Sequence, residues 1–237
     1  MEQPHRHHWP LYGLRIRTPR LELRLPDLAL LDELAAVAAD GVHDAAEMPF
    51  TVPWTDAAPE ERGRATFQHV LATVAQWTPE SWTLSLAVAR EDRREGRPER
   101  LPEDQPEDRP EGRVVGRQDM VGTAFGVTRE VETGSWLGLA HQGQGIGTEM
   151  RAAVLHFACE QLGAHTVTSA AMTDNAPSLA VSRKLGYVPD GVQVAAVRGQ
   201  VRTLQRLRLD RAGWEAHRTV PVRGEGWTGE CRALFGA

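Results

Sequence analysis

The sequence has little of what secreted, membrane or nucleic-acid-binding proteins need. Only two of its 237 residues are cysteines, too few for a disulfide framework. No apolar run approaches the roughly 20 residues of a membrane-spanning helix, and the first residues lack the apolar stretch of a signal peptide. The formal net charge of -5 disfavours nonspecific binding to nucleic acid, which needs a basic surface. These absences predict a cytoplasmic protein without a membrane or nucleic-acid partner.

The composition suits one sizeable domain. Hydrophobic residues make up 41% of the chain and charged residues 25%, which is ordinary for a globular protein that buries a large core. We expect a flexible N-terminal segment at 1–10, one domain over 11–215 and a C-terminal extension over 216–237. Within the domain, residues 91–113 have almost no apolar side chains and predict a disordered insertion.

Hydrophobic periodicity predicts strands and helices in a mixed order. Helices are expected from Leu28, with Asp27 as N-cap, and from near Pro59 through Trp77. The strands predicted in this half of the chain cover 11–26, bent or folded as a hairpin, then 82–90, 119–127 and 132–140, the last two joined by a turn at 128–131.

The second half of the chain alternates helices with strands. A strong amphipathic helix is predicted from Ile146 to near Leu162, followed by a strand over 165–173 and a short helix over 175–186. Two further strands are expected over 187–197 and 200–210. This order predicts an α/β (α+β) fold with one mixed, mostly antiparallel sheet flanked by helices.

The segment "HQGQGIGTEM" packs three glycines into five positions between a predicted strand and a predicted helix. Glycine inside regular structure costs about 0.5–1 kcal/mol relative to alanine. A strand, a glycine-rich turn and a helix N-terminus together form an anion site, because unpaired N–H groups point outward at the positive end of the helix dipole. The segment therefore predicts a phosphate-binding loop.

Residue detail separates three kinds of phosphate loop. A P-loop needs a lysine after its glycines, where this chain has Glu149, and the dinucleotide fingerprint needs a third glycine where it has Thr148. The pattern Q/R-x-x-G-x-G/A fits Gln142–Gly147 at every fixed position.

This third pattern resembles the pyrophosphate loop of the GNAT acetyltransferase superfamily. "TDNAPSLAVSRKLGY" resembles the second signature of that superfamily, and "TPRLELRLPDLALLDEL" resembles the N-terminal motif of its ribosomal-protein N-terminal acetyltransferase branch. "MPFTVPW" occupies that branch's acceptor loop. The resemblance covers Leu14 to Trp214. It implies a single-domain GNAT-like sheet splayed between its fourth and fifth strands, with acetyl-CoA or another acyl-CoA as donor and no metal.

The resemblance also implies roles for individual residues. Backbone N–H groups of the loop would hold the pyrophosphate, and the strand before it would pair with the pantetheine arm and donate to the thioester carbonyl. Gly138 would let the arm lie close, or form a bulge, and Asn175 would bind the arm, cap a helix, or both. The implied donor-binding residues are Trp136, Leu137, Gly138, Leu139, Gln142, Gly143, Gln144, Gly145, Ile146, Gly147, Thr148, Asn175 and Ser178.

Catalytic and acceptor residues are less marked in the sequence. Ser182 occupies the position where many superfamily members have a tyrosine that protonates the departing thiolate, and serine is a weaker acid. The predicted catalytic residues are Ser182, Leu139 and Glu47, with His43, Asp44 and Glu132 as other candidates for the base. The predicted acceptor-site residues are His43, Phe50 and Trp54, although both aromatic side chains could equally pin the loop to the core. Cys159 is expected to be a core residue.

The resemblance implies an N-acetyltransferase that moves an acyl group from a CoA thioester to a primary amine by direct attack. The acceptor would be a protein N-terminus or a small-molecule amine, and a homodimer is a further expectation for this superfamily. Two other classes stay open: a CoA-binding protein without catalysis, favoured by Ser182 and by the lack of an obvious base, and a dinucleotide enzyme.

Overall fold

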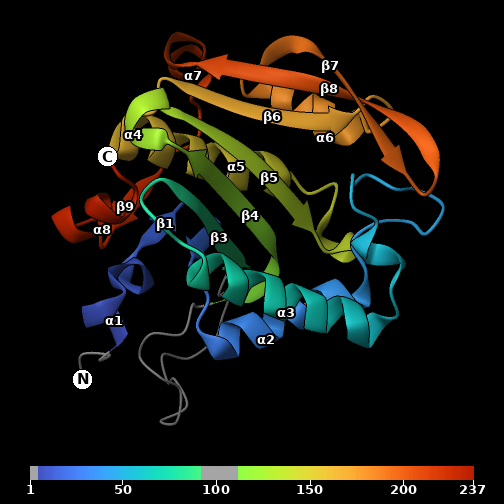
Figure 1. The fold of residues 1–237 in the computed structure, drawn as a ribbon, viewed down its shortest axis with the longest axis horizontal. Coiled ribbons are helices and arrows are strands. Elements are labelled where there is room, and N and C mark those ends of the chain that lie inside the picture. Colours follow the sequence, from blue (N-terminus) through green and yellow to red (C-terminus); the bar gives the residue numbers. More distant parts are fainter. Residues whose placement is uncertain (1–4, 92–111) are drawn as a thin grey trace.

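A computed structural model describes residues 5–91 and 112–237 of the chain. The predicted flexible segment at 1–10 and the predicted insertion at 91–113 therefore lie partly or mostly outside the described residues. In the described part, nine strands form one sheet in the order β7-β8-β6-β5-β4-β3-β2-β1-β9 (Figure 1). The strands are β1 Arg15–Arg17, β2 Leu21–Arg24, β3 Ser81–Arg90, β4 Arg113–Thr123, β5 Glu130–Leu137, β6 Thr166–Met172, β7 Val188–Val197, β8 Gln200–Asp210 and β9 Arg223–Glu225.

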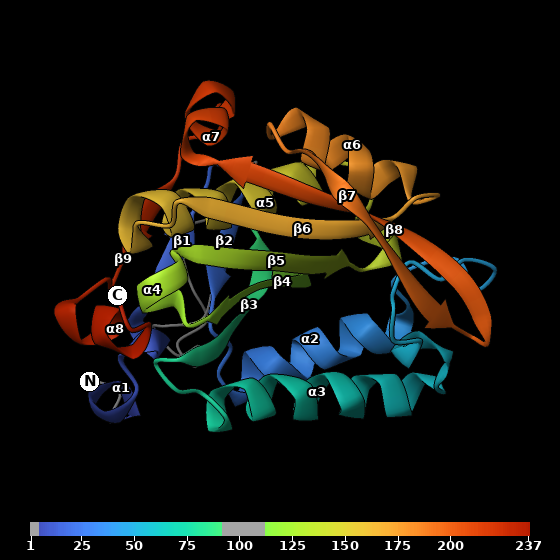
Figure 2. The ribbon, with the colours of Figure 1, turned by 45° about the horizontal axis from the view of Figure 1, so that its top comes forward.

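Helices cover both faces of this sheet. Figure 2 shows α2 and α3 side by side below the sheet, with α5 and α6 on the opposite face. The helices are α1 His5–His8, α2 Leu28–Asp40, α3 Pro59–Ala75, α4 Phe125–Thr128, α5 Ile146–His156, α6 Ala176–Lys184, α7 Arg211–His217 and α8 Gly229–Leu234; a π-helical turn extends α5 through Leu162. This mixed α/β architecture confirms the predicted fold class.

The long helices begin where the sequence predicts. The side chain of Asp27 accepts a hydrogen bond of 2.9 Å from the Leu30 N–H and so caps α2. Helix α3 begins at Pro59, whose missing N–H costs nothing in the first turn. Helix α5 buries Met150, Ala153 and Val154 on the face toward the sheet, as its periodicity requires.

The two central strands differ from their predicted bounds. β4 begins at Arg113 rather than 119 and ends at Thr123 rather than 127. The chain then leaves the sheet, through Ala124 and Arg129 in the left-handed region, and forms the helical turn α4 where the sequence predicts the end of the strand 119–127. The predicted turn at 128–131 is shorter than expected, because β5 already begins at Glu130. This turn places the Phe125 side chain fully inside the core. β5 ends at Leu137 rather than 140, because a 3-10 turn starts at the next residues.

β5 and β6 separate along their length. They pair in parallel only where Glu130–Glu132 faces Thr166–Thr168. Just beyond, two side-chain hydrogen bonds still join the strands: Thr133 Oγ1 donates to the Thr168 carbonyl at 3.2 Å and Ser169 Oγ donates to the Thr133 carbonyl at 3.0 Å. No ladder continues past this point, so the open half of β5 faces a splay. The predicted splay between the fourth and fifth strands is found here. β5 and β6 are the fourth and fifth of the predicted strands when 11–26, which the structure divides into β1 and β2, is counted as one.

The C-terminal extension takes part in the main fold. β9 pairs antiparallel with β1, with Arg15 opposite Glu225. Cys231 and Phe235 are fully buried, and the Phe235 ring meets Trp82 edge-on at a centroid distance of 4.7 Å. A strand of three residues leaves too little alternation to be recognised in the sequence. In the ranges 5–91 and 112–237, no helix combines the length and the apolar character needed to span a membrane.

Candidate active site

The glycine loop presents a row of open backbone amides. Gly143 and Gly145 have φ values of +72° and +77°, which L side chains rarely adopt. The N–H groups of residues 143–148 find no acceptor among the described residues, and the first amide of the helix to be paired is that of Glu149, which donates to the Gly145 carbonyl at 3.2 Å. Six unpaired donors at the N-terminus of α5 have the arrangement that anions bind in proteins, so the predicted phosphate loop stays a prediction that this geometry suits.

Gln142 supports this loop from behind. Its side-chain Nε2 donates to the Val42 carbonyl at 2.7 Å and to the Leu137 carbonyl at 3.1 Å. Its own N–H, which was expected to face the phosphate, donates instead to the Leu139 carbonyl at 3.3 Å. Gln142 therefore ties the loop to the end of α2 and to β5, and the open donors begin at Gly143.

An ion pair between the half-buried Arg20 and the buried Glu149 fixes the other side of the loop. Glu149, which is 7% exposed, accepts from Arg20 Nε at 2.6 Å and from Thr18 Oγ1 at 2.6 Å. Arg20 Nη1 also donates to the Gln144 carbonyl at 3.1 Å. The arginine neutralises the carboxylate that stands in place of a P-loop lysine. Sequence reasoning missed this pair, because its members lie 129 positions apart.

Positive charge gathers around the open amides. Arg90 Nη1 donates to Gln144 Oε1 at 2.5 Å, while Gln144 Nε2 donates to the Ala140 carbonyl at 3.0 Å. Burial, together with the charges of Arg113 and Arg90, lowers the pKa of His141 beside the loop. Because Glu149 offsets the charge of Arg20, Arg90 and Arg113 supply the positive charge that attracts a polyanion to this side of the loop.

The open edge of β5 supplies two further backbone donors. The Gly138 N–H donates to the Val115 carbonyl of β4 at 2.9 Å. Because backbone groups alternate sides along an antiparallel ladder, the N–H groups of Ser135 and Leu137 point the other way, into the splay. The predicted donor Leu139 does not serve, since its N–H already donates to the Gly41 carbonyl at 3.0 Å.

Gly138 is a glycine for a packing reason. A Cβ at this position would lie 2.7 Å from the Cγ1 of Val37 on α2. The close approach of α2 therefore accounts for the glycine, and neither a bulge nor a bound arm is needed to explain it. Trp136 and Leu137, on either face of the strand, are both buried.

Ser182 does not occupy the exposed position expected of an acid. It is 0% exposed. Its Oγ donates to the Ser178 carbonyl at 3.1 Å and accepts from Arg151 Nη1 at 2.9 Å. A hydroxyl engaged on both sides and covered by protein cannot reach a departing sulfur without rearrangement.

The remaining residues of the predicted donor site lie around the loop. Asn175 caps α6 by accepting from the Ser178 N–H at 3.1 Å, which leaves its side-chain amide nitrogen without a partner among the described residues. Ile146 is buried and anchors the start of α5 in the core. Gly147 and Thr148 lie half-buried in the first turn. Asn175 therefore fits the capping role, and its amide remains free for a ligand.

The predicted acceptor loop packs onto β5. A chain of aromatic rings runs from His43 to Phe50, to Trp54 and to Trp136, with centroid distances of 5.7, 5.4 and 5.9 Å. Phe50 also packs against a small cluster that includes Met172 at the end of β6. The loop therefore contacts both arms of the splay, which fits the pinning role weighed for Phe50 and Trp54.

A cavity of about 250 Å³ lies beside this loop and is lined in part by Val42, His43, Asp56 and Arg198. The His43 ring is held by Thr55 Oγ1 at Nε2 and by the Asp44 carbonyl at Nδ1, both at 2.7 Å. Asp56 pairs with Arg198 at the tip of the β7–β8 hairpin, and this hydrogen-bonded pairing lowers the pKa of Asp56. Glu47 is exposed, and its predicted role as base stays a prediction.

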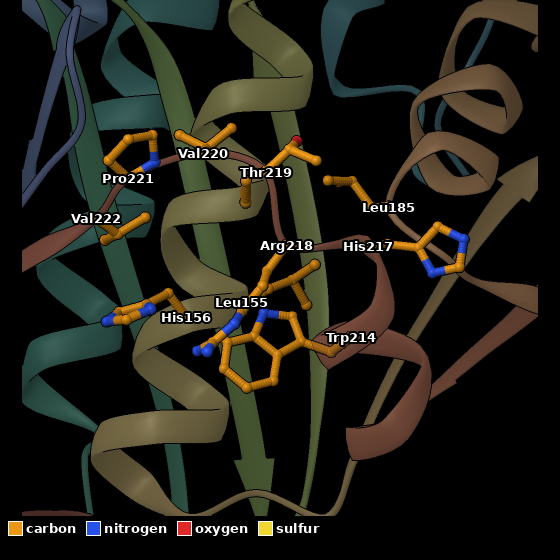
Figure 3. Close-up of a pocket in the computed structure, with 11 residues that line it drawn as sticks. Leu155, His156, Leu185, Trp214, His217, Arg218, Thr219, Val220, Pro221 and Val222 are labelled. Atoms are coloured by element: carbon orange, nitrogen blue, oxygen red, sulfur yellow. The ribbon is translucent and has the colours of Figure 1, made fainter.

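A second cavity, of about 290 Å³, lies behind α5. Figure 3 shows that segment 218–222 and Trp214 lie against the helix there. Arg218 stacks on Trp214 and pairs with Glu160 at 3.3 Å. None of the predicted site residues lines this cavity. Across the described ranges, no three His, Cys, Asp or Glu side chains are grouped to hold a metal ion.

Comparison with solved structures shows the same fold. Mycobacterium smegmatis RimJ, solved in complex with CoA-disulfide, shares 16% identity over 86% of this chain and 90% of its own, with a TM-score of 0.63. A GCN5-related N-acetyltransferase from Brucella melitensis shares 21% identity over 86% of this chain and 81% of its own, with a TM-score of 0.59. A spermidine N-acetyltransferase chimera of Vibrio cholerae SpeG and hSSAT shares 14% identity, covers 82% of this chain and 98% of its own, and has a TM-score of 0.55.

The family assignment rests on the sequence match. The model of the acetyltransferase (GNAT) domain matches residues 20–188. This range runs from Arg20, which braces the glycine loop, through the loop itself and past Ser182 to the start of β7. The chain belongs to the GNAT acetyltransferase family.

Proposed function

We propose that this protein is an acetyl-CoA-dependent N-acetyltransferase that acylates a primary amine on a protein N-terminus or a small molecule. One observation carries the proposal: the six open amides of residues 143–148 adjoin the unpaired stretch of β5. A diphosphate seated on the loop would place a thioester-bearing arm along that strand. The positive charge of Arg90 and Arg113 suits the negative charge of such a donor.

The chemistry follows from the donors at the open edge. The neutral amine attacks the thioester carbonyl carbon, a C–N bond forms, and the C–S bond breaks. The N–H groups of Ser135 and Leu137 are the backbone donors available to the carbonyl oxygen as negative charge develops on it. The amine loses its proton to water, since His43 is held by two partners and Glu47 is exposed.

The acceptor would enter from the side of the loop that carries Phe50 and Trp54. The cavity at Val42 and Asp56 adjoins the phosphate loop, because Gln142 Nε2 bonds to the Val42 carbonyl. The Asp56 carboxylate would bind the ammonium group of an acceptor, which would compete with Arg198 for this carboxylate. The names of the structural neighbours include both a putative ribosomal-protein-serine acetyltransferase from Vibrio cholerae and a spermidine N-acetyltransferase chimera, so both acceptor classes belong in the test.

A thiol-release assay with acetyl-CoA tests this function. The amine panel should contain peptide N-termini, lysine, polyamines and aminated antibiotics. We expect turnover with at least one of them and none with the Gly145→Glu variant. The burial of Ser182 favours one alternative, a CoA-binding protein without catalysis. Tight binding of acetyl-CoA without turnover on any amine would support that alternative, and preferential thermal stabilisation by NAD would favour a dinucleotide enzyme.

Two further proposals concern assembly and location. β7 is an edge strand of the sheet, and it exposes Val188, Val192 and Val194. Unpaired edges with apolar side chains favour strand pairing with a second copy, so we infer a homodimer, which light scattering tests. Both cysteines are free and buried, which suits the reducing cytoplasm that we propose as its location.

A further inference from the structure

Arg151 of α5 is a buried cation without a carboxylate partner. The residue is 6% exposed. Its fork donates to Ser182 Oγ at 2.9 Å and to Ser135 Oγ at 3.2 Å, and its Nε has no hydrogen-bond partner in the described structure. No ion pair joins it to an acid among the described residues. Burial lowers the pKa of this guanidinium, which nonetheless stays protonated in proteins.

Such an arrangement needs a functional explanation. An unpaired charge in the protein interior is among the most costly groups to bury. The Nε atoms of Arg62 and Arg117 are also without a partner in the described structure, so the buried charge without an acid, rather than the unpaired Nε, distinguishes Arg151. The neighbours of Arg151 on the buried face of α5 include apolar side chains such as those of Met150 and Val154. For packing alone, an aliphatic side chain would therefore suit position 151 better than an arginine.

The two hydroxyls that hold Arg151 come from opposite sides of the splay. Ser135 lies on the open stretch of β5, and Ser182 lies on α6, which follows β6. Ser182 gives its proton to the Ser178 carbonyl. The Ser135 proton has no acceptor among the described residues, and its side chain is only half-buried. Ser135 is therefore a free donor polarised by a buried cation at the open edge.

We propose that Ser135, supported by Arg151, hydrogen-bonds the departing CoA thiolate and stabilises its negative charge. This proposal rests on the proposed function and transfers to Ser135 the role that the sequence suggested for Ser182. When the C–S bond breaks, its electron pair stays on sulfur. Arg151 gives up no proton, the hydroxyl proton remains on Ser135, and the thiolate is protonated afterwards by water. Arg151 is a positioning residue, and Ser182 holds the second arm of its fork.

The cation acts where charge develops. A thioester sulfur is neutral before attack and anionic after it, so a fixed positive charge nearby favours the late state over the early one. Hydroxyl donors in a partly buried site, where the local dielectric is lower, transmit this effect better than they would in bulk water. The same interaction lowers the pKa of the thiol of bound, unacylated CoA, which makes the proposal measurable without turnover.

The test is a titration of the bound CoA thiol, followed by the ultraviolet absorbance of the thiolate. We expect the wild-type protein to bind CoA with a thiol more acidic than that of free CoA. In the Ser135→Ala and Arg151→Met variants, the thiolate fraction at a given pH should fall about tenfold, equivalent to one pKa unit. Arg151→Lys should restore part of the effect.

Ser169→Ala is the matched control, because it removes another buried hydroxyl at the splay that does not contact Arg151. It should leave the bound thiol as acidic as in the wild type. Equal thiol acidity in the wild type and in Ser135→Ala, with CoA bound and turnover intact, would overturn this proposal alone. Absence of CoA binding to the wild type would overturn the proposed function as well. Ser135→Ala keeps the test valid if Arg151→Met does not fold.

Discussion

Two buried regions of this protein contrast in how they satisfy their polar groups. In the aromatic cluster of Trp77, Trp82 and Phe235, both indole nitrogens donate to carbonyls of the C-terminal extension, at 2.7 Å to Leu234 and at 3.2 Å to Phe235. Around Arg151, at the splay, a guanidinium is held by two serine hydroxyls and leaves its Nε unpaired.

The difference assigns separate tasks to the two regions. The aromatic cluster buries large surfaces with satisfied donors, which is how a core contributes stability. Around Arg151, burial of a charge carries a desolvation cost that an apolar side chain packed in the same place would not have. We therefore expect substitutions in the first region to change stability with intact chemistry, and substitutions in the second to change chemistry with little loss of stability.

The largest effect on stability is expected from Phe235→Ala. The ring is fully buried against Trp82 and Phe157, and its removal should lower the free energy of unfolding by about 3–5 kcal/mol. Chemical denaturation measures this loss. The folded fraction should still bind CoA with wild-type affinity, and a specific loss of CoA binding would show that the two regions are not separate.

The largest effect on binding is expected from Gly145→Glu. At φ +77° a side chain is strained, and its Cβ would lie 3.4 Å from Arg20 Nη2, so the carboxylate would add negative charge beside the open amides. CoA affinity should fall by at least about 100-fold, roughly 2.7 kcal/mol. Calorimetry measures the affinity. Gly163→Glu is the matched control, since Gly163 has φ +75° at the far end of the same helical segment. It should lose stability and keep CoA affinity.

Arg151→Met should separate stability from activity. Replacing a buried charge with an apolar side chain of similar length should raise the free energy of unfolding by about 1–2 kcal/mol. Turnover should fall at the same time, because the thiolate loses its nearby cation. Thermal denaturation and the thiol-release assay give the two readouts. A variant that is both less stable and fully active would contradict the contrast between the regions.

The smallest effect is a pH dependence in the apolar core. Burial raises the pKa of the Cys159 thiol from 9.0 to about 12. The unfolded chain therefore loses this proton first, and stability present below about pH 9 falls by about 1 kcal/mol between about pH 9 and pH 10. Denaturation across this range should show a shallower decline in Cys159→Ala. Identical slopes would mean that the thiol ionises in the folded protein.

Local patterns determined what the sequence could predict. The helices at Leu28, Pro59 and Ile146 have strong periodicity or a recognisable first residue, so their positions were predicted correctly. The glycine loop could be recognised because the spacing of its glycines before a helix is itself the local pattern that leaves backbone amides open to an anion. Residue Arg151, which interrupts the inward stripe of a predicted helix, was the available signal for the buried cation.

Tertiary hydrogen bonds account for what the sequence could not reveal. The Leu139 N–H is taken by Gly41, and the Glu149 carboxylate is neutralised by Arg20. Each partner lies about 100 or more positions away, where spacing carries no information. Ser182 matched a family position, but it is buried and its Oγ accepts a hydrogen bond from Arg151, 31 positions away. The sequence therefore indicated the open amides of the loop better than the hydrogen-bonding roles of the side chains around them.

The most direct test of the account compares CoA with pantetheine by amide chemical shifts on labelled protein. The central claim is that the N–H groups of residues 143–148 bind a diphosphate. We predict that CoA shifts these amides strongly, and that pantetheine, which lacks the diphosphate, leaves them nearly unchanged. Equal shifts with both ligands, or CoA shifts confined to the cavity behind α5, would contradict the claim.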